Sequence, residues 1–222
     1  MNIHEPATLL TDYLLAGLGI GLAWHLRRQV SPGNIAARWW IRALLAMSAA
    51  AFVGGSYHGF APNFPPALAA AWWKLVLWII CFLGLGMGLS LVREIVPPGR
   101  QSGWDRFLTA KFLLSAAVIV ARPEFFVAMI DYGLAMIAWA VAALLFRRAW
   151  SGWMLAAVGF SAIAGWVQQS GWEISDRLNH NDVYHLIQAL ALVGFYRAGR
   201  LLGRVRPMIL QPPAGKPPPG KA

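Results

Sequence analysis

The chain has 222 residues, of which 58% are hydrophobic and 13% are charged, against roughly 25% charged residues in an average soluble domain. This composition excludes an ordinary soluble protein and predicts a single-domain integral membrane protein. The formal net charge is +10, but the basic residues lie at the ends of apolar runs, so we exclude nucleic-acid binding and expect the charges to orient the chain in a membrane. The single cysteine, Cys81, excludes a disulfide framework and a cysteine-ligated metal site.

Apolar runs long enough to cross a bilayer recur along most of the chain. A membrane-spanning helix needs about 20 mostly apolar residues, and the first run begins near Thr8 without a basic leader, so we expect it to be retained. Residues 1–206 are therefore predicted to form an all-α bundle of seven transmembrane helices. Residues 207–222 are rich in Pro, Gly and Lys and predict a disordered basic tail. The expected spans are 8–26, 40–60, 67–92, 105–121, 125–146, 150–169 and 183–203.

The distribution of Lys and Arg predicts the orientation of these spans. Placing the N-terminus outside and the C-terminus in the cytoplasm assigns most basic residues to cytoplasmic segments, as orientation by positive charge requires. The short loops carry no organelle signal, so we expect the inner membrane of a bacterium. Most Trp and Tyr residues, Trp40 and Trp150 among them, flank span ends and predict an interfacial aromatic belt. The oligomeric state stays open.

The acidic residues and histidines gather on one side of the expected membrane. Four of the five histidines and seven of the nine acids fall in the outer half, which orientation by Lys and Arg does not explain, because acids contribute little to it. An outward-facing polar pocket does explain it. The seven acids are Glu5, Asp12, Glu124, Asp131, Glu173, Asp176 and Asp182.

Three ionisable residues are expected inside the bilayer, where a charge costs roughly 2.5–3.5 kcal/mol even on mild scales. They are Asp12, Lys74 and Asp131. Either Lys74 pairs with one of the two carboxylates and the pair is merely tolerated, or these groups belong to a site. Two segments with glycines four apart, 17–21 and 84–88, predict close helix packing.

The start of the last span and the end of the second span carry candidate metal ligands. Asp182 and His185 are three residues apart and share a helix face, and His58 is expected at the same level. A catalytic zinc takes three protein ligands and keeps one open position. His58, His185 and one of Asp182 or His180 would supply such a set, and Asp12 or Asp131 could act as general base toward a zinc-bound water.

The simpler alternative is that these histidines are polar anchors at the membrane interface. His180 and His185 are five residues apart and do not share a face in a regular helix. Both could reach one ion only if the last span begins after His180.

The pattern resembles the alkaline ceramidases within a superfamily of seven-helix membrane hydrolases that includes adiponectin-type receptors. The resemblance lies in "SYHG" (56–59), "HNDVYHL" (180–186) and "EPATLLTDY" (5–13). It implies seven helices, a zinc held by one histidine of the second helix and two of the seventh, and hydrolysis of a lipid amide. It also implies a catalytic serine, assigned to Ser56, and calcium near Glu5 and Asp12.

Three positions depart from this family pattern. The family's histidine four residues before His185 is Asn181 here, and its serine four residues before His58 is Gly54. The family's acid in the third helix is absent from 65–75, which contains only Lys74. The resemblance therefore supports the fold more than the activity.

Three functions follow as hypotheses. The first is a zinc-dependent hydrolase that cleaves an amide bond of a lipid. The second is a non-enzymatic sensor, assembly factor or accessory subunit of the same fold that has lost its metal. The third is a haem protein with His58 and His185 as axial ligands, or a transporter, for which an inverted repeat is missing.

Overall fold

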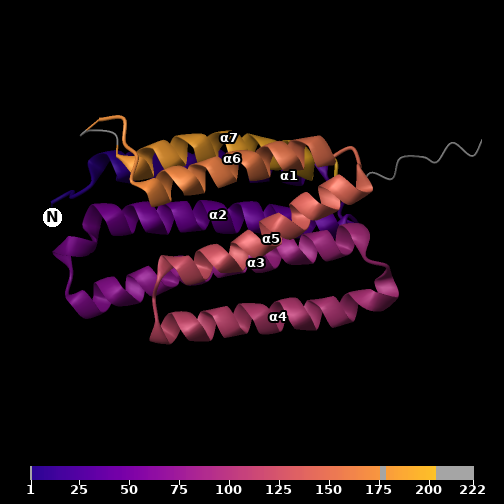
Figure 1. The fold of residues 1–222 in the computed structure, drawn as a ribbon, viewed down its shortest axis with the longest axis horizontal. Helices are drawn as coiled ribbons and strands as arrows, with labels where there is room; N and C mark the ends of the chain where they lie inside the picture. Colours follow the sequence, from indigo (N-terminus) through magenta and orange to yellow (C-terminus); the bar gives the residue numbers. More distant parts are fainter. Residues whose placement is uncertain (1, 176–178, 204–222) are drawn as a thin grey trace, which may run out of the picture.

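The computed structural model describes residues 2–175 and 179–203, and this part of the chain forms a bundle of seven long helices without a β-strand (Figure 1). The predicted all-α class and the seven helices are confirmed. Asp176 and the tail predicted over 207–222 lie outside the described residues. The helices are α1 (Pro6–Gln29), α2 (Ile35–Phe60), α3 (Pro66–Ile95), α4 (Pro98–Ala121), α5 (Phe125–Phe146), α6 (Ser151–Ser170) and α7 (His180–Gly199), and a short 3-10 turn, η1 (Ala61–Asn63), follows α2.

Capping chemistry explains why several helices begin earlier than their apolar runs. At the start of α2, the side-chain oxygen of Asn34 accepts a hydrogen bond from the backbone N–H of Ala37 at 3.0 Å, as an N-cap residue does. At α4, Pro98 takes the first helical position, where its missing N–H costs nothing. The Asn34 cap and the proline at the first position of α4 thus mark helix starts that lie before the ranges expected from hydropathy.

Successive helices run in alternating directions along the long axis of the bundle (Figure 1). α1 packs against α2 and α7, while α3 packs against α2, α4 and α5. α4 lies at one edge of the bundle, and Ile119 is its one fully buried residue within the described chain (Figure 1). One end of the bundle therefore collects the starts of α1 and α7 with the end of α2.

Four elements are long and apolar enough to cross a membrane among the described residues: α1, α2 with η1, α3 and α5. Many of the large apolar side chains are exposed, for example Leu14 at 62% and Leu145 at 73%, as expected where lipid covers a surface. The remaining three long helices carry more polar residues, such as Lys111 in α4 and Asp182 in α7.

Three buried tryptophans connect the core at the opposite end of the bundle. Trp139 packs edge-on against Trp40 and Trp150, with ring centroids 5.0 and 5.1 Å apart. Each indole N–H has an acceptor: Phe195 O for Trp40, Met87 O for Trp139 and Glu94 Oε1 for Trp150. The belt assignment is therefore wrong for Trp40 and Trp150, since both are 1% exposed.

Glycines of α3 allow neighbouring helices to pack closely against it. A Cβ on Gly84 would lie 2.6 Å from Asp131 Oδ1, and one on Gly86 would lie 3.3 Å from the Ala43 side chain. The packing prediction is confirmed for 84–88. It is wrong for Gly17 and Gly21, which have no described neighbour within 4 Å; Gly19, between them, contacts Ser48 instead.

Candidate functional site

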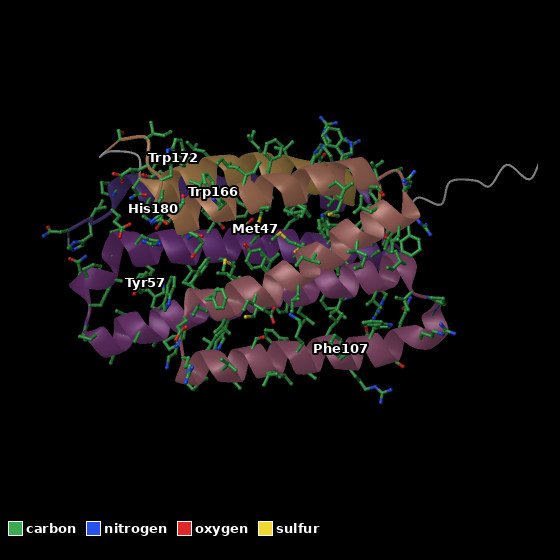
Figure 2. The ribbon with its side chains drawn as sticks, viewed as in Figure 1. Met47, Tyr57, Phe107, Trp166, Trp172 and His180 are labelled. Carbon is green, nitrogen blue, oxygen red and sulfur yellow. The ribbon has the colours of Figure 1, made fainter. Side chains whose placement is uncertain are left out.

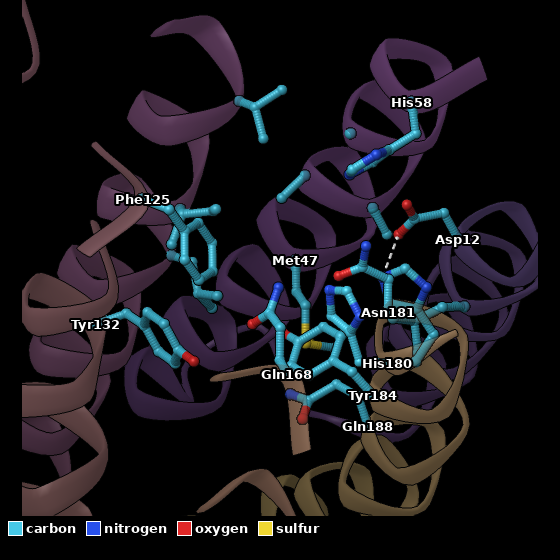
Figure 3. A pocket seen from close by; sticks show the side chains of 18 of the residues that line it. Asp12, Met47, His58, Phe125, Tyr132, Gln168, His180, Asn181, Tyr184 and Gln188 are labelled. Atoms are coloured by element: carbon cyan, nitrogen blue, oxygen red, sulfur yellow. Dashed lines mark ion pairs between the residues drawn. The ribbon is translucent and has the colours of Figure 1, made fainter. Parts of the chain in front are cut away.

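A cavity of about 340 Å³ lies among the helices near the end of the bundle where α7 begins. His180, the first residue of α7, marks this end in Figure 2. The walls come from α1, α2, α3, α5, α6 and α7 (Figure 3). A cavity built from almost the whole bundle is therefore present, and of the acids expected on that side that the structure describes, only Asp12 lines it.

The cavity has two chemically different walls. In Figure 3, the polar wall with Asp12, His58 and Asn181 lies opposite the apolar wall with the rings of Phe125 and Tyr132. Such a cavity matches a molecule with a polar group at one end and a hydrocarbon portion at the other. Polar lining residues include Asp12, His58, Gln168, His180 and His185, and apolar ones include Met47, Val76, Ile80, Leu83 and Phe125.

Asp12 and His185 form the central pair of the polar wall. His185 Nε2 lies 3.1 Å from Asp12 Oδ1, the contact drawn as a dashed line in Figure 3. The other ring nitrogen, Nδ1, lies 3.0 Å from Thr11 Oγ1. Both residues are buried, at 4% and 8% exposure. Asp12 Oδ2 has no hydrogen-bond partner among the described residues.

Gly55 allows α1 to approach α2 closely enough to place this pair. A Cβ at position 55 would lie 2.6 Å from Asp12 Cβ, closer than two carbon atoms can pack. The close approach is therefore a requirement of the site as well as of helix packing.

Asp182 fixes the start of α7 and does not line the cavity. Its Oδ2 accepts the backbone N–H of Asn179 at 2.9 Å, and the Asn179 side chain accepts the Asp182 N–H at 3.2 Å. This reciprocal arrangement is a capping box. Thr11 also lies 3.4 Å from Asp182 Oδ1. Asp182 thus orients the helix that carries His185.

His58 and His180 both line the cavity with His185, so the two spans do bring their imidazoles to one site. His58 Nδ1 lies 3.2 Å from Glu5 Oε2, and its other nitrogen has no protein partner in the described ranges. α7 begins at His180 itself, not after it. His180 nevertheless faces the cavity because the first turn of α7 forms its rim (Figure 3).

The donor atoms do not form a ready-made zinc site. Within residues 2–175 and 179–203, no group of three His, Cys, Asp or Glu side chains is arranged to hold a metal ion. His185 has protein partners at both ring nitrogens, and Asp182 is engaged in the capping box. Zinc, and calcium near Glu5 and Asp12, therefore stay predictions.

The structure places Ser56 and Asp131 away from the cavity wall. Ser56 Oγ donates to Phe52 O at 2.7 Å and lies 2.8 Å from Tyr13 OH. Asp131 belongs to a separate buried cluster with Lys111 and Ser115. Neither residue is among those that line the cavity.

Asp131 pairs with Lys111 of α4 rather than with Lys74. The Lys111 ammonium contacts Asp131 Oδ2 at 2.6 Å, and the Ser115 hydroxyl donates to the same oxygen at 2.6 Å. Lys74 instead donates to Val120 O at 2.9 Å. The suggested pairing of Lys74 with Asp131 or Asp12 is thus wrong, because α4 packs against α3 and α5 and supplies its own lysine to Asp131.

Sequence reasoning missed Thr11, Gln168 and Lys111. Thr8 and Thr11 are three residues apart, so they share the face of α1 that meets α7, and this spacing was a usable signal. Gln168 sits near the end of an apolar run, where nothing in the local pattern marks it. Lys111 was overlooked because the segment 105–121 was treated as one apolar span.

Comparison with known proteins gives a family but no function. A family model described as a family of unknown function (DUF6962) matches residues 7–204. No curated protein and no solved structure matches the chain significantly.

Proposed function

Since the chain belongs to this family of unknown function, we propose from its cavity that the protein is a membrane-embedded hydrolase that cleaves an amide bond of a ceramide-like lipid. All seven helices cross the membrane in this proposal, with the N-terminus outside and the C-terminus in the cytoplasm of a bacterium. The observation that carries the proposal is the buried Asp12–His185 pair on the wall of a cavity with one polar and one apolar side.

The two walls support a lipid as the ligand. A lipid amide has a polar linkage next to a long hydrocarbon chain, and the polar wall can donate hydrogen bonds to its carbonyl and hydroxyl oxygens through Gln168 and His180. The hydrocarbon chain fits beside Met47, Ile80 and Leu83. Cavities of this size bind small molecules through a mostly apolar lining with a few placed polar groups.

The reaction is derived from Asp12 as general base. His185 Nε2 lies 3.1 Å from Asp12 Oδ1 and positions the carboxylate. In the proposed reaction, Asp12 Oδ2 binds a water molecule. Asp12 takes a proton from this water, the water oxygen bonds to the amide carbon, and the C–N bond then breaks as the proton passes to the leaving nitrogen. The products are a fatty acid and an amine. A positioned base of this kind contributes roughly 100-fold to 10,000-fold to a rate.

A second candidate is a non-enzymatic lipid sensor or accessory subunit. It is favoured by two observations. Both ring nitrogens of His185 contact protein atoms, and the described histidines and acids form no three-ligand group. In this case the cavity binds a lipid and releases it unchanged.

The test is an assay of the purified protein with a lipid amide that carries a labelled acyl chain. We expect release of labelled fatty acid, and Asp12→Asn should slow it at least roughly 100-fold, since the amide cannot accept the proton. Asp105→Asn, at the opposite end of the bundle beside Arg93, is the matched control and should retain the rate.

Three further results separate the alternatives. Bound lipid without any hydrolysis supports the sensor. Stoichiometric metal in the purified protein, lost in His58→Ala and His185→Ala, supports the zinc prediction. Equal rates for wild type and Asp12→Asn contradict the proposed reaction.

A further inference from the structure

A second polar hollow lies at the end of the bundle opposite the cavity. A groove of about 420 Å³ is formed by the end of α1, the turn over 30–32 and the first turns of α2. Three arginines line it, Arg27 from α1 and both Arg38 and Arg42 from α2. All three side chains are exposed.

The groove has an uncompensated positive charge. No Asp or Glu lines it, and none of the three arginines forms an ion pair in the part of the chain that the structure describes. Arg38 donates to Pro32 O at 3.4 Å, and Arg42 lies 4.3 Å above the Trp39 ring. Neither contact removes charge, because a guanidinium stays protonated in proteins.

The acidic residues at this end already have partners. Glu94 accepts hydrogen bonds from Trp150 Nε1 and from the backbone N–H of Gly203, at 2.9 and 2.8 Å. Asp105 forms a bidentate pair with Arg93, with both distances 2.8 Å. The charge of the groove is therefore available to an external anion.

The exposed face of α2 continues from these arginines into an apolar stripe. Arg38, Leu45 and Phe52 are spaced seven residues apart and share one helix face. Leu45 is 43% exposed and Phe52 is 53% exposed, and Leu45 also lines the groove. An anionic group held at Arg38 would thus have hydrocarbon-compatible surface directly beside it along the helix.

We propose that this groove binds the phosphate of an anionic phospholipid, with its acyl chains lying along α2 over Leu45 and Phe52. Guanidinium groups bind phosphate oxygens in bidentate fashion, and basic pockets between membrane helices bind anionic headgroups. The adjoining apolar stripe favours a lipid over free phosphate. The proposal concerns a site separate from the cavity and does not depend on catalysis.

The experiment is a lipid titration of the full-length protein in detergent, followed by native mass spectrometry. The probes are phosphatidylglycerol, phosphatidylcholine and inorganic phosphate. We expect selective binding of phosphatidylglycerol that millimolar inorganic phosphate does not displace. The Arg38→Gln/Arg42→Gln variant should bind it roughly thirtyfold more weakly, and Arg27→Gln alone roughly fivefold more weakly.

The control is Arg100→Gln/Arg106→Gln, which removes the same charge from exposed positions of α4 and should leave binding unchanged. Equal binding of the two phospholipids, an equal loss in the control, or displacement by inorganic phosphate would overturn the proposal. If Arg38→Gln/Arg42→Gln fails to fold, unchanged binding by Arg27→Gln overturns it as well.

Discussion

At the scale of single residues, the site depends on how closely Asp12 approaches α2. Thr11 and Asp12 are neighbours in α1 and contact the two ring nitrogens of one histidine, so a small shift of α1 changes both contacts. Gly55 sets that distance, because any side chain there meets Asp12.

Gly55→Ala should therefore destabilise the protein although alanine is the better helix former. The added methyl group forces α1 and α2 apart, at a cost of about 1–3 kcal/mol in the free energy of unfolding. Gly17→Ala is the matched control, since nothing described lies within 4 Å of that position, and it should stabilise by up to about 1 kcal/mol. Unfolding in mixed micelles measures both. Equal effects of the two substitutions would contradict the packing described here.

The residue scale also shows what the sequence could and could not predict. His58 and His185 were expected at one level, and both line the cavity together with Asp12 and His180. Asp182 was read as a ligand because it shares a face with His185, but its carboxylate satisfies backbone N–H groups at the start of α7. Helix periodicity predicts on which face a side chain lies. It does not predict that nearby backbone N–H groups will bind a carboxylate such as that of Asp182.

At the scale of elements, α4 contributes a charge that the hydropathy pattern concealed. The Lys111–Asp131 pair joins α4 to α5, and Gly84 of α3 leaves room for the carboxylate. Asp131 Oδ1 has no hydrogen-bond partner in the described chain, so the pair depends on Lys111 and Ser115 on its other oxygen.

Lys111→Met should strongly destabilise the bundle. Removing one partner of a buried ion pair leaves an uncompensated charge and costs roughly 3–5 kcal/mol of unfolding free energy. Lys74→Met is the control, because Lys74 forms one hydrogen bond to a backbone carbonyl and no described ion pair. The double variant Lys111→Met/Asp131→Asn should recover much of the loss. A loss for Lys74→Met as large as that for Lys111→Met would count against this assignment.

The number and order of the helices could be predicted because hydropathy and loop punctuation determine them. The ends of the helices could not be predicted in the same way, because capping residues determine them. Asn34 caps the start of α2, and Asn179 caps the start of α7. The ion pairs between helices could not be predicted from the sequence either. Lys74 and Lys111 are both lysines within apolar runs, and only the position of α4 beside α3 and α5 decides which one reaches Asp131.

At the scale of the whole molecule, the two ends of the bundle differ in chemistry. One end carries the cavity with Asp12 and three histidines, and the other carries the arginine groove and the tryptophan core. The proposed orientation places the cavity end outside.

Labelling of introduced cysteines in intact cells tests this orientation. Glu124→Cys, exposed in the turn between α4 and α5, should react with a membrane-impermeant maleimide, whereas Ser31→Cys, exposed between α1 and α2, should react only after permeabilisation. The native Cys81 is buried, so the parent chain serves as the unlabelled control. The reverse labelling pattern would invert the proposed topology.

The most direct test of the proposed lipid binding in the cavity is photocrosslinking with a lipid amide that carries a diazirine in its acyl chain. We expect crosslinks at Met47, Ile80 or Leu83, and their loss in Ala51→Phe, because the larger side chain fills the cavity from its own wall. Crosslinks confined to the outer surface, for example at Leu113 and Leu114 of α4, and unchanged in Ala51→Phe, would contradict it.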